Sequence, residues 1–184
     1  MQPLETALPG VYLLEPKLFA DSRGYFFESY QQQKFADMGI TSTFVQDNRS
    51  YSKQGSLRGL HYQLHHPQAK LCTVLTGEVY DVAVDIRQGS PNFGHWVGVV
   101  LSGENKRQIY IPRGFAHGFV VLSQTAEFMY KCDEFYYPQD ERGILWDDPA
   151  LGITWGMADP ILSDKDRQNP ALNAIPAADL PTYP

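Results

Sequence analysis

Three histidines and two cations gather within thirteen residues, in the stretch RGLHYQLHHPQAK from Arg58 to Lys70. The imidazole of histidine is the commonest metal ligand among side chains, and it is also the natural base at neutral pH. A protonated lysine has no lone pair, so it repels a divalent cation and instead stabilises negative charge on an oxygen. The stretch is therefore a candidate for either a metal site or a proton-transfer site.

Two segments resemble the two sequence motifs of cupins. The first is GLHYQLHHPQAKLCTVLTG at 59–77, with a glycine at each end, and the second is IPRGFAHGFVV at 111–121. His61 and His117 fall on the first and last metal-ligand positions of these motifs. The resemblance therefore places both histidines at one site inside a β-barrel.

The other two cupin ligand positions hold residues of the wrong type. Gln63 replaces the second histidine, and Lys70 replaces the glutamate. A structural metal usually needs four donors and a catalytic metal three plus solvent, so two histidines with a cation between them do not suffice. His65 and His66 could substitute in principle, but adjacent strand residues face opposite ways and Pro67 indicates a loop, which favours surface positions for this pair. We therefore predict no metal here, and we expect this histidine pair at the surface.

Without a metal, His61 and Lys70 become candidates for acid–base chemistry. Strand alternation lets His61 share a face with Gln63, and Lys70 share one with Cys72, so both can line a concave interior. A base beside a cation suits removal of a proton next to a carbonyl group, because the cation stabilises the resulting oxyanion. The alternative is a core histidine with a hydrogen-bond partner and a lysine that reaches solvent, which is commoner for either residue alone.

Composition and charge favour one all-β domain in a reducing compartment. The chain of 184 residues is 13% aromatic and contains 15 glycines and 13 prolines, which is typical of turn-rich β-structure. The net charge of -6 disfavours nonspecific binding to nucleic acid or to an anionic membrane. No leader peptide or membrane span is apparent, so we expect a cytoplasmic protein in which Cys72 and Cys132 are reduced core residues.

Short apolar and β-branched runs, separated by turn residues, predict the strands. We expect strands in HWVGVVLS, RQIYIP, HGFVVLS and EFMYKCDEFY, and two more in KLCTVLTGEVYDVAVDIR that are joined as a hairpin at TGE. This pattern predicts a cupin-type double-stranded β-helix, or jelly roll, with a few short helices. One domain is expected over 1–184, with a core at about 10–155 and a C-terminal extension at 156–184 that packs on the barrel.

Two segments carry helix signals. In SYQQQKFADMGI, Ser29 is the expected N-cap, and Gly39 is expected to end the helix. In SDKDRQNPAL, Ser163 is the expected N-cap of a short terminal helix.

Longer strings over residues 21–166 carry a more specific resemblance. They are, in order, DSRGYFFESY, FVQDNRSYSKQGSLRGLHYQ, QAKLCTVLTGEVYDVAVDIR, FGHWVGVVLSGENKRQIYIPRGFAHGFVVLS, FMYKCDEFYYP, ERGILWDDP and LSDKD. They resemble the dTDP-4-dehydrorhamnose 3,5-epimerases, a family of the cupin superfamily. The resemblance implies a cofactor-independent homodimer that exchanges an edge strand, so that N-terminal residues contribute to the partner's site. It also implies inversion of C3 and C5 of dTDP-4-dehydro-6-deoxy-D-glucose, which gives dTDP-4-dehydro-L-rhamnose for cell-surface polysaccharide.

The resemblance assigns catalytic roles residue by residue. His61 becomes the base that removes the C3 and C5 protons, and Asp166 of SDKD becomes the carboxylate that holds it. Tyr130 becomes the acid that returns a proton from the opposite face, and Lys70 keeps the oxyanion role. Local alternatives exist, because Ser-x-x-Asp is also a helix-capping pattern and an isolated Tyr130 suits a core position.

The remaining matched residues suit recognition of the nucleotide. Arg23, Arg58 and Lys165 carry the charge for a diphosphate, and Tyr136 matches a ring that stacks on thymine. The other expected substrate contacts are Glu28, Gln46, Asp47, Asn48, Lys70, His117 and Glu141. Each of these residues taken singly also suits a solvated surface, and only their joint occurrence favours a binding site.

Two departures from the family pattern and two other functions stay open. The loop LHHPQAK is one residue shorter than expected, and WGMADP replaces a Trp-Pro ending. A sister enzyme of the same fold would epimerise only C3 or C5, or would act as a 3,4-ketoisomerase. A non-catalytic sugar-nucleotide-binding cupin would require His61, Tyr130 and Asp166 to coincide by chance.

Overall fold

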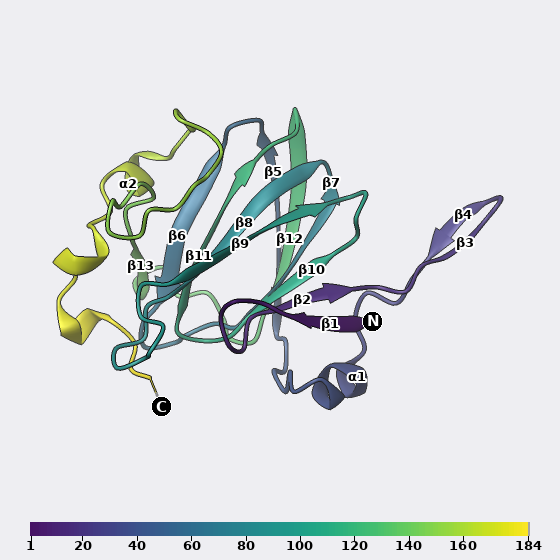
Figure 1. Ribbon diagram of the computed structural model, residues 1–184, viewed down its shortest axis with the longest axis horizontal. Helices are drawn as coiled ribbons and strands as arrows, with labels where there is room; N and C mark the ends of the chain where they lie inside the picture. Colours follow the sequence, from purple (N-terminus) through teal and green to yellow (C-terminus); the bar gives the residue numbers. More distant parts are fainter. Residues whose placement is uncertain (184) are drawn as a thin grey trace.

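Two antiparallel β-sheets face each other in the computed structural model, which describes residues 1–183 (Figure 1). The six-stranded sheet contains, in spatial order, β1 (Gln2–Glu5), β2 (Tyr12–Glu15), β10 (Gln108–Ile111), β7 (Lys70–Thr76), β12 (Thr125–Cys132) and β5 (Gln46–Lys53). The five-stranded sheet contains β13 (Glu141–Gly143), β6 (Leu57–Gln63), β11 (Phe115–Val121), β8 (Glu78–Asp85) and β9 (Trp96–Ser102). The predicted all-β jelly roll is confirmed.

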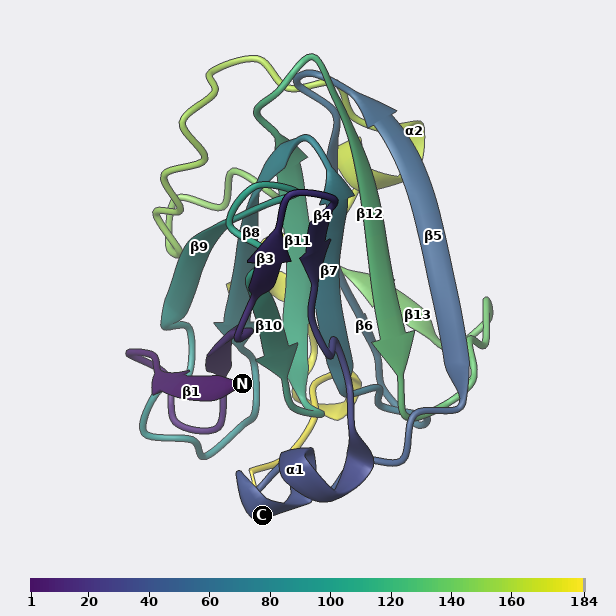
Figure 2. The same cartoon turned by 90° about the vertical axis from the view of Figure 1, so that its right-hand side faces the viewer.

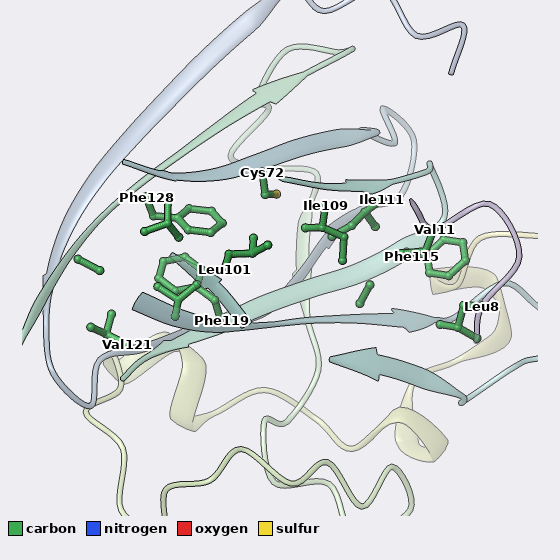
Figure 3. Packing of buried hydrophobic residues seen from close by; sticks show 14 residues of the cluster. Leu8, Val11, Cys72, Leu101, Ile109, Ile111, Phe115, Phe119, Val121 and Phe128 are labelled. Atoms are coloured by element: carbon green, nitrogen blue, oxygen red, sulfur yellow. The ribbon is translucent and has the colours of Figure 1, made fainter. Parts of the chain in front are cut away.

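Apolar side chains from both sheets fill the space between them. Phe119 of β11 and Phe128 of β12 stack with ring centroids 4.1 Å apart, which joins the two sheets near their centres (Figure 3). Every residue of β11 is buried, because its other face packs on Trp155 and Leu172 of the C-terminal segment. Burial on both faces explains why this strand reads as a continuous apolar run rather than an alternating one. Cys72 and Cys132 are buried and form no disulfide, as expected.

The turn at TGE does not form the expected hairpin. β7 and β8 flank Gly77, but they belong to different sheets and do not pair with each other. Gly77 has φ 79°, and a β-carbon at this position would lie 2.1 Å from the carbonyl oxygen of Thr125. The chain therefore crosses here from one sheet to the other. The sequence signal identified the turn correctly but not the sheet in which the next strand lies.

The helices are short and lie outside the barrel. α1 (Gln32–Asp37) is capped by the side chain of Gln31, which accepts a hydrogen bond from the backbone of Lys34, so the prediction of Ser29 as N-cap is wrong. α2 (Asp164–Arg167) is capped by Ser163, as expected. The 3-10 helices η1 (Leu172–Ala174) and η2 (Ala177–Asp179) follow it. Within residues 1–183, no helix is long and apolar enough to cross a membrane.

A small hairpin near the N-terminus extends away from the barrel (Figure 1) and lies in front of it in the turned view (Figure 2). It consists of β3 (Phe19–Asp21) and β4 (Gly24–Phe26), which pair only with each other. Its aromatic side chains are exposed, with relative exposures of 56% for Phe19, 57% for Tyr25 and 71% for Phe26. This hairpin therefore presents an apolar surface that the rest of the chain does not cover.

Candidate active site

A cavity of about 600 Å³ opens between the two sheets and beside the C-terminal segment. Its wall contains most of the residues that the sequence predicts for the site. These are Asn48, Arg58, His61, Lys70, His117, Tyr130, Tyr136, Glu141, Lys165 and Asp166. The fold therefore brings together side chains from both sheets and from the extension that follows them.

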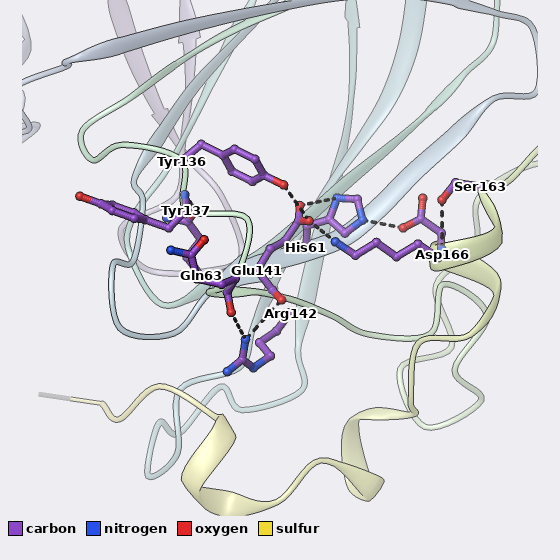
Figure 4. Close-up of polar contacts among 10 residues, drawn as sticks. His61, Gln63, Tyr136, Tyr137, Glu141, Arg142, Ser163 and Asp166 are labelled. Atoms are coloured by element: carbon purple, nitrogen blue, oxygen red, sulfur yellow. Dashed lines mark hydrogen bonds and ion pairs between the residues drawn. The ribbon is translucent and has the colours of Figure 1, made fainter.

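His61 is fixed in the five-stranded sheet, on the strand next to the edge strand β13. On β6 it pairs with His117 of β11 on one side and with Gly143 of β13 on the other. Its Nε2 lies 2.5 Å from Oδ1 of Asp166, and its side chain remains 26% exposed (Figure 4). The imidazole is therefore held by a carboxylate while one edge stays accessible from the cavity.

Asp166 combines the two roles that the sequence left as alternatives. Its backbone N–H donates to Oγ of Ser163 at 3.1 Å, which is the helix-capping contact. Its carboxylate does not serve the cap and contacts His61 instead. Burial alone would raise the pKa of Asp166, but the hydrogen bond and charge of His61 bring it below the ordinary value. The carboxylate is therefore ionised at neutral pH, as an orienting partner of a basic imidazole must be.

Tyr130 and Lys70 approach from the opposite sheet. Tyr130 lies on β12 and Lys70 on β7, and the lysine Nζ is 5.7 Å from the centroid of the tyrosine ring. Burial raises the pKa of Tyr130 well above its ordinary value, so the phenol is protonated at neutral pH and able to donate. Within residues 1–183, Lys70 forms no salt bridge, so its charge is available to the cavity.

A second histidine–carboxylate pair lies deeper in the sheet. Nε2 of His117 is 2.9 and 3.0 Å from the two carboxylate oxygens of Asp81, and both residues are buried. Burial lowers the pKa of His117 despite the opposing effect of Asp81. Asp81 is absent from the residues that the sequence predicts for the site. The available signal was a charged residue inside the buried run VYDVAV, since a buried charge requires a partner.

The donor set does not suit a metal. Among residues 1–183, only Cys72, Asp81 and His117 place three potential ligand atoms within 4.8 Å of one another. The contacts of His117 with Cys72 and with Asp81 use the same nitrogen, Nε2. Burial raises the pKa of the Cys72 thiol, so this side chain stays protonated. Gln63 uses its amide for the backbone of His66, Phe135 and Tyr137. The chemistry of the site is therefore that of proton donors and acceptors.

One end of the cavity is polar and partly exposed. Glu141 Oε2 accepts a hydrogen bond from the hydroxyl of Tyr136 at 3.1 Å and forms an ion pair with Lys165 (Figure 4). Arg58 donates to the hydroxyl of Ser52 at 3.1 Å. It has no carboxylate partner in the described part of the chain, so its charge is free for a ligand.

Four predicted site residues do not line this cavity. Gln46 lies next to it, where its side chain contacts Asn48 and the backbone of Tyr136. The remaining three form ion pairs elsewhere: Asp47 with Lys131, Arg23 with Asp21 and Glu28 with Lys34. The β3–β4 turn carries Arg23 far from the barrel (Figure 1). Arg23, Glu28 and Asp47 therefore lie outside the cavity of their own chain.

Comparison with known proteins places the chain in one family. The family profile described as dTDP-4-dehydrorhamnose 3,5-epimerase matches residues 5–174. The chain belongs to the dTDP-4-dehydrorhamnose 3,5-epimerase family. A member from Pseudomonas aeruginosa is 56% identical over 174 residues, which cover 94% of this chain and 96% of that protein. The resemblance found in the sequence is confirmed, and the family belongs to the isomerases.

Solved structures of epimerases have the same fold. A dTDP-6-deoxy-D-glucose-3,5-epimerase from Legionella pneumophila, in complex with dTDP-4-keto-L-rhamnose, is 52% identical and superposes with a TM-score of 0.97, covering 100% of this chain and 98% of that chain. A 3'-monoepimerase from Streptomyces bikiniensis, in complex with dTDP-quinovose, is 34% identical with a TM-score of 0.90, covering 100% and 93%. Epimerases of this fold therefore include enzymes that invert one carbon and enzymes that invert two.

Proposed function

We propose that this chain inverts C3 and C5 of dTDP-4-dehydro-6-deoxy-D-glucose to give dTDP-4-dehydro-L-rhamnose. The observation that carries the proposal is the pair of His61 and Asp166 on one side of the cavity, facing Tyr130 on the other. Inversion of a carbon requires a base and an acid on opposite faces of the sugar ring, and these residues come from opposite sheets.

The reaction is a proton exchange next to the C4 ketone. His61 removes the proton from the carbon, the electron pair moves to the ketone oxygen, and Lys70 stabilises the resulting oxyanion. Tyr130 then donates its proton to the opposite face of the same carbon. The sequence repeats at the second carbon, with no net gain or loss of atoms or electrons.

The polar end of the cavity is the proposed nucleotide site. Arg58 and Lys165 would bind the diphosphate, for which the guanidinium fork of arginine is a good match. Tyr136 is 46% exposed and presents a ring for stacking on the base. Further substrate contacts are assigned to Gln46, Asn48, Glu141 and His117.

A homodimer would complete the site. Residues 1–183 leave the apolar β3–β4 hairpin uncovered, and both Arg23, which the hairpin carries, and Glu28 lie outside the cavity. We infer that a second copy covers this hairpin and receives both residues at its substrate site. Light scattering should give a mass of about twice the 20.8 kDa chain. A monomer at micromolar concentration would contradict this assembly.

Two observations bear on the alternatives. Inversion of a single carbon is the activity in the name of the Streptomyces bikiniensis relative, but that protein is 34% identical, against 52% for the 3,5-epimerase from Legionella pneumophila. Simple binding without catalysis would leave the short contact between His61 and Asp166 without a function.

The buried, unpaired cysteines support the proposed cytoplasmic location.

The test is NMR of the substrate dTDP-4-keto-6-deoxyglucose with the purified protein in heavy water. We expect deuterium at both C3 and C5 and inversion at both carbons, with a protein-free sample as the control for spontaneous exchange. Inversion at only one carbon would identify a mono-epimerase. Absence of exchange at both carbons would reduce the protein to a sugar-nucleotide binder.

A further inference from the structure

The double inversion poses a problem that a single inversion does not. Each inversion leaves one extra proton on His61 and one fewer on Tyr130, so His61 must lose its proton before it reacts at the second carbon. This requirement rests on the proposed epimerase reaction. The question is by which route the proton leaves the imidazole.

Asp166 closes one of the two routes. It occupies Nε2 of His61 at 2.5 Å, and its own side chain is only 5% exposed. A proton on this side would stay between the imidazole and a buried carboxylate. The nitrogen that takes the proton from carbon, and later releases it, is therefore Nδ1.

Glu141 is the acidic group nearest to Nδ1. Its Oε1 lies 4.0 Å from this nitrogen, close enough for transfer through one water or after a small approach (Figure 4). Its other oxygen, Oε2, is held by Tyr136 and Lys165. Within residues 1–183, Oε1 accepts no hydrogen bond, so it is the oxygen left available for a proton.

The same carboxylate connects the imidazole with solvent. The side chain of Glu141 is 16% exposed, and that of its partner Lys165 is 53% exposed. Burial alone would raise the pKa of Glu141, but the hydrogen bond from Lys165 and the charge of His61 bring it below the ordinary value. A proton that reaches Glu141 is therefore released quickly, and the carboxylate is ready for the next one.

We propose that Glu141 is the proton outlet of His61 and resets the base between the two inversions. The Nδ1–H bond breaks, the proton passes to Oε1 directly or through a bridging water, and water takes it from there. Tyr130 regains its proton from solvent, so the two transfers balance. In this role Glu141 acts through His61. Its expected contact with the substrate is a second, separate role.

The test compares Glu141→Gln with wild type in heavy water, with NMR of both inversions over time. Glutamine keeps the shape and an acceptor for Tyr136 and Lys165 but cannot carry the proton. We expect the second inversion to slow by about tenfold relative to the first, so that a singly inverted sugar accumulates. Recovered substrate should carry less deuterium, because return from His61 delivers the original proton. The matched control is Glu104→Gln, which removes an exposed carboxylate elsewhere and should behave as wild type.

Two results would overturn the proposal. One is an unchanged ratio of the two inversion rates in Glu141→Gln, whether or not the affinity for dTDP falls, since that pattern describes a binding contact alone. The other is Glu141→Ala, with a melting temperature close to wild type, in which added formate fails to restore the second inversion. Failure of the wild-type protein to exchange either proton would instead refute the proposed function, so the two failures are distinguishable.

Discussion

Two histidine–carboxylate pairs stand side by side in the five-stranded sheet, where His61 and His117 are register partners. Their side chains differ in exposure, at 26% and 5% for His61 with Asp166 but 7% and 0% for His117 with Asp81. The first imidazole keeps a nitrogen toward the cavity, whereas the second borders the same cavity but is almost wholly buried. The same two residue types thus form an accessible pair in one place and a buried pair in the other, and in the proposed reaction only the accessible pair can reach the reacting carbon.

The largest effect should separate the two histidines directly. His61→Asn keeps the shape but removes the base, so exchange at C3 and C5 should fall by about 10³-fold or more, as measured by NMR in heavy water. His117→Asn should retain measurable exchange at both carbons. Near wild-type exchange in His61→Asn would place the base elsewhere and end the distinction between the two pairs.

The next effect concerns the acid that faces the accessible pair. Tyr130→Phe leaves His61 and Lys70 in place, so deuterium should still enter the recovered substrate. Inversion should fall by about 10²-fold, because the carbanion is reprotonated from the face that it left. Analysis of sugar configuration alongside deuterium content tests this. Equal losses of exchange and inversion would show that Tyr130 does not act as the separate acid.

The two carboxylates should differ in the same way as their histidines. Asp166→Asn should lower the exchange rate by about 100-fold, since it removes the charge that orients the base. It should cost less stability than Asp81→Asn, because its partner His61 is 26% exposed. Asp81→Asn should act mainly on stability, at about 1–3 kcal/mol in urea unfolding, because it disturbs a buried hydrogen bond. A larger kinetic loss in Asp81→Asn than in Asp166→Asn would reverse the assigned roles.

The smallest effect is a pH dependence that belongs to the buried pair. The pKa of His117 is lowered from 6.5 on folding, chiefly by burial, so below that pH the unfolded chain binds a proton that the folded chain does not. Stability should therefore fall as pH drops below 6.5, by at most about 1.4 kcal/mol per pH unit from this group. His117→Gln should flatten that slope in urea unfolding between pH 7 and pH 5.5. An unchanged slope would show that His117 does not account for it.

Much of the barrel was predictable because strand periodicity is local. The four runs that correspond to β9, β10, β11 and β12 all form strands, since β-branched and aromatic residues between turn residues select extended backbone. No sequence pattern predicts β1, because its residues QPLE lack apolar alternation and pair only at the sheet edge. The TGE turn misled for a related reason, because a local turn signal cannot tell a hairpin from a crossing between sheets.

The candidates for the reacting groups follow from the amino-acid sequence alone. The cupin positions of His61 and Lys70, and the family strings around them, are properties of short segments, so they can be read without a fold. The resemblance to the family also names Asp166, but the nitrogen of His61 that stays free and the pairing of Asp81 with His117 emerge only when distant segments meet. Asp166 lies 105 residues from His61 in the chain, and Asp81 lies 36 from His117. The alternation of side chains along a strand determines the face of the sheet on which each residue lies. The packing of the two sheets determines which residues of other segments it contacts.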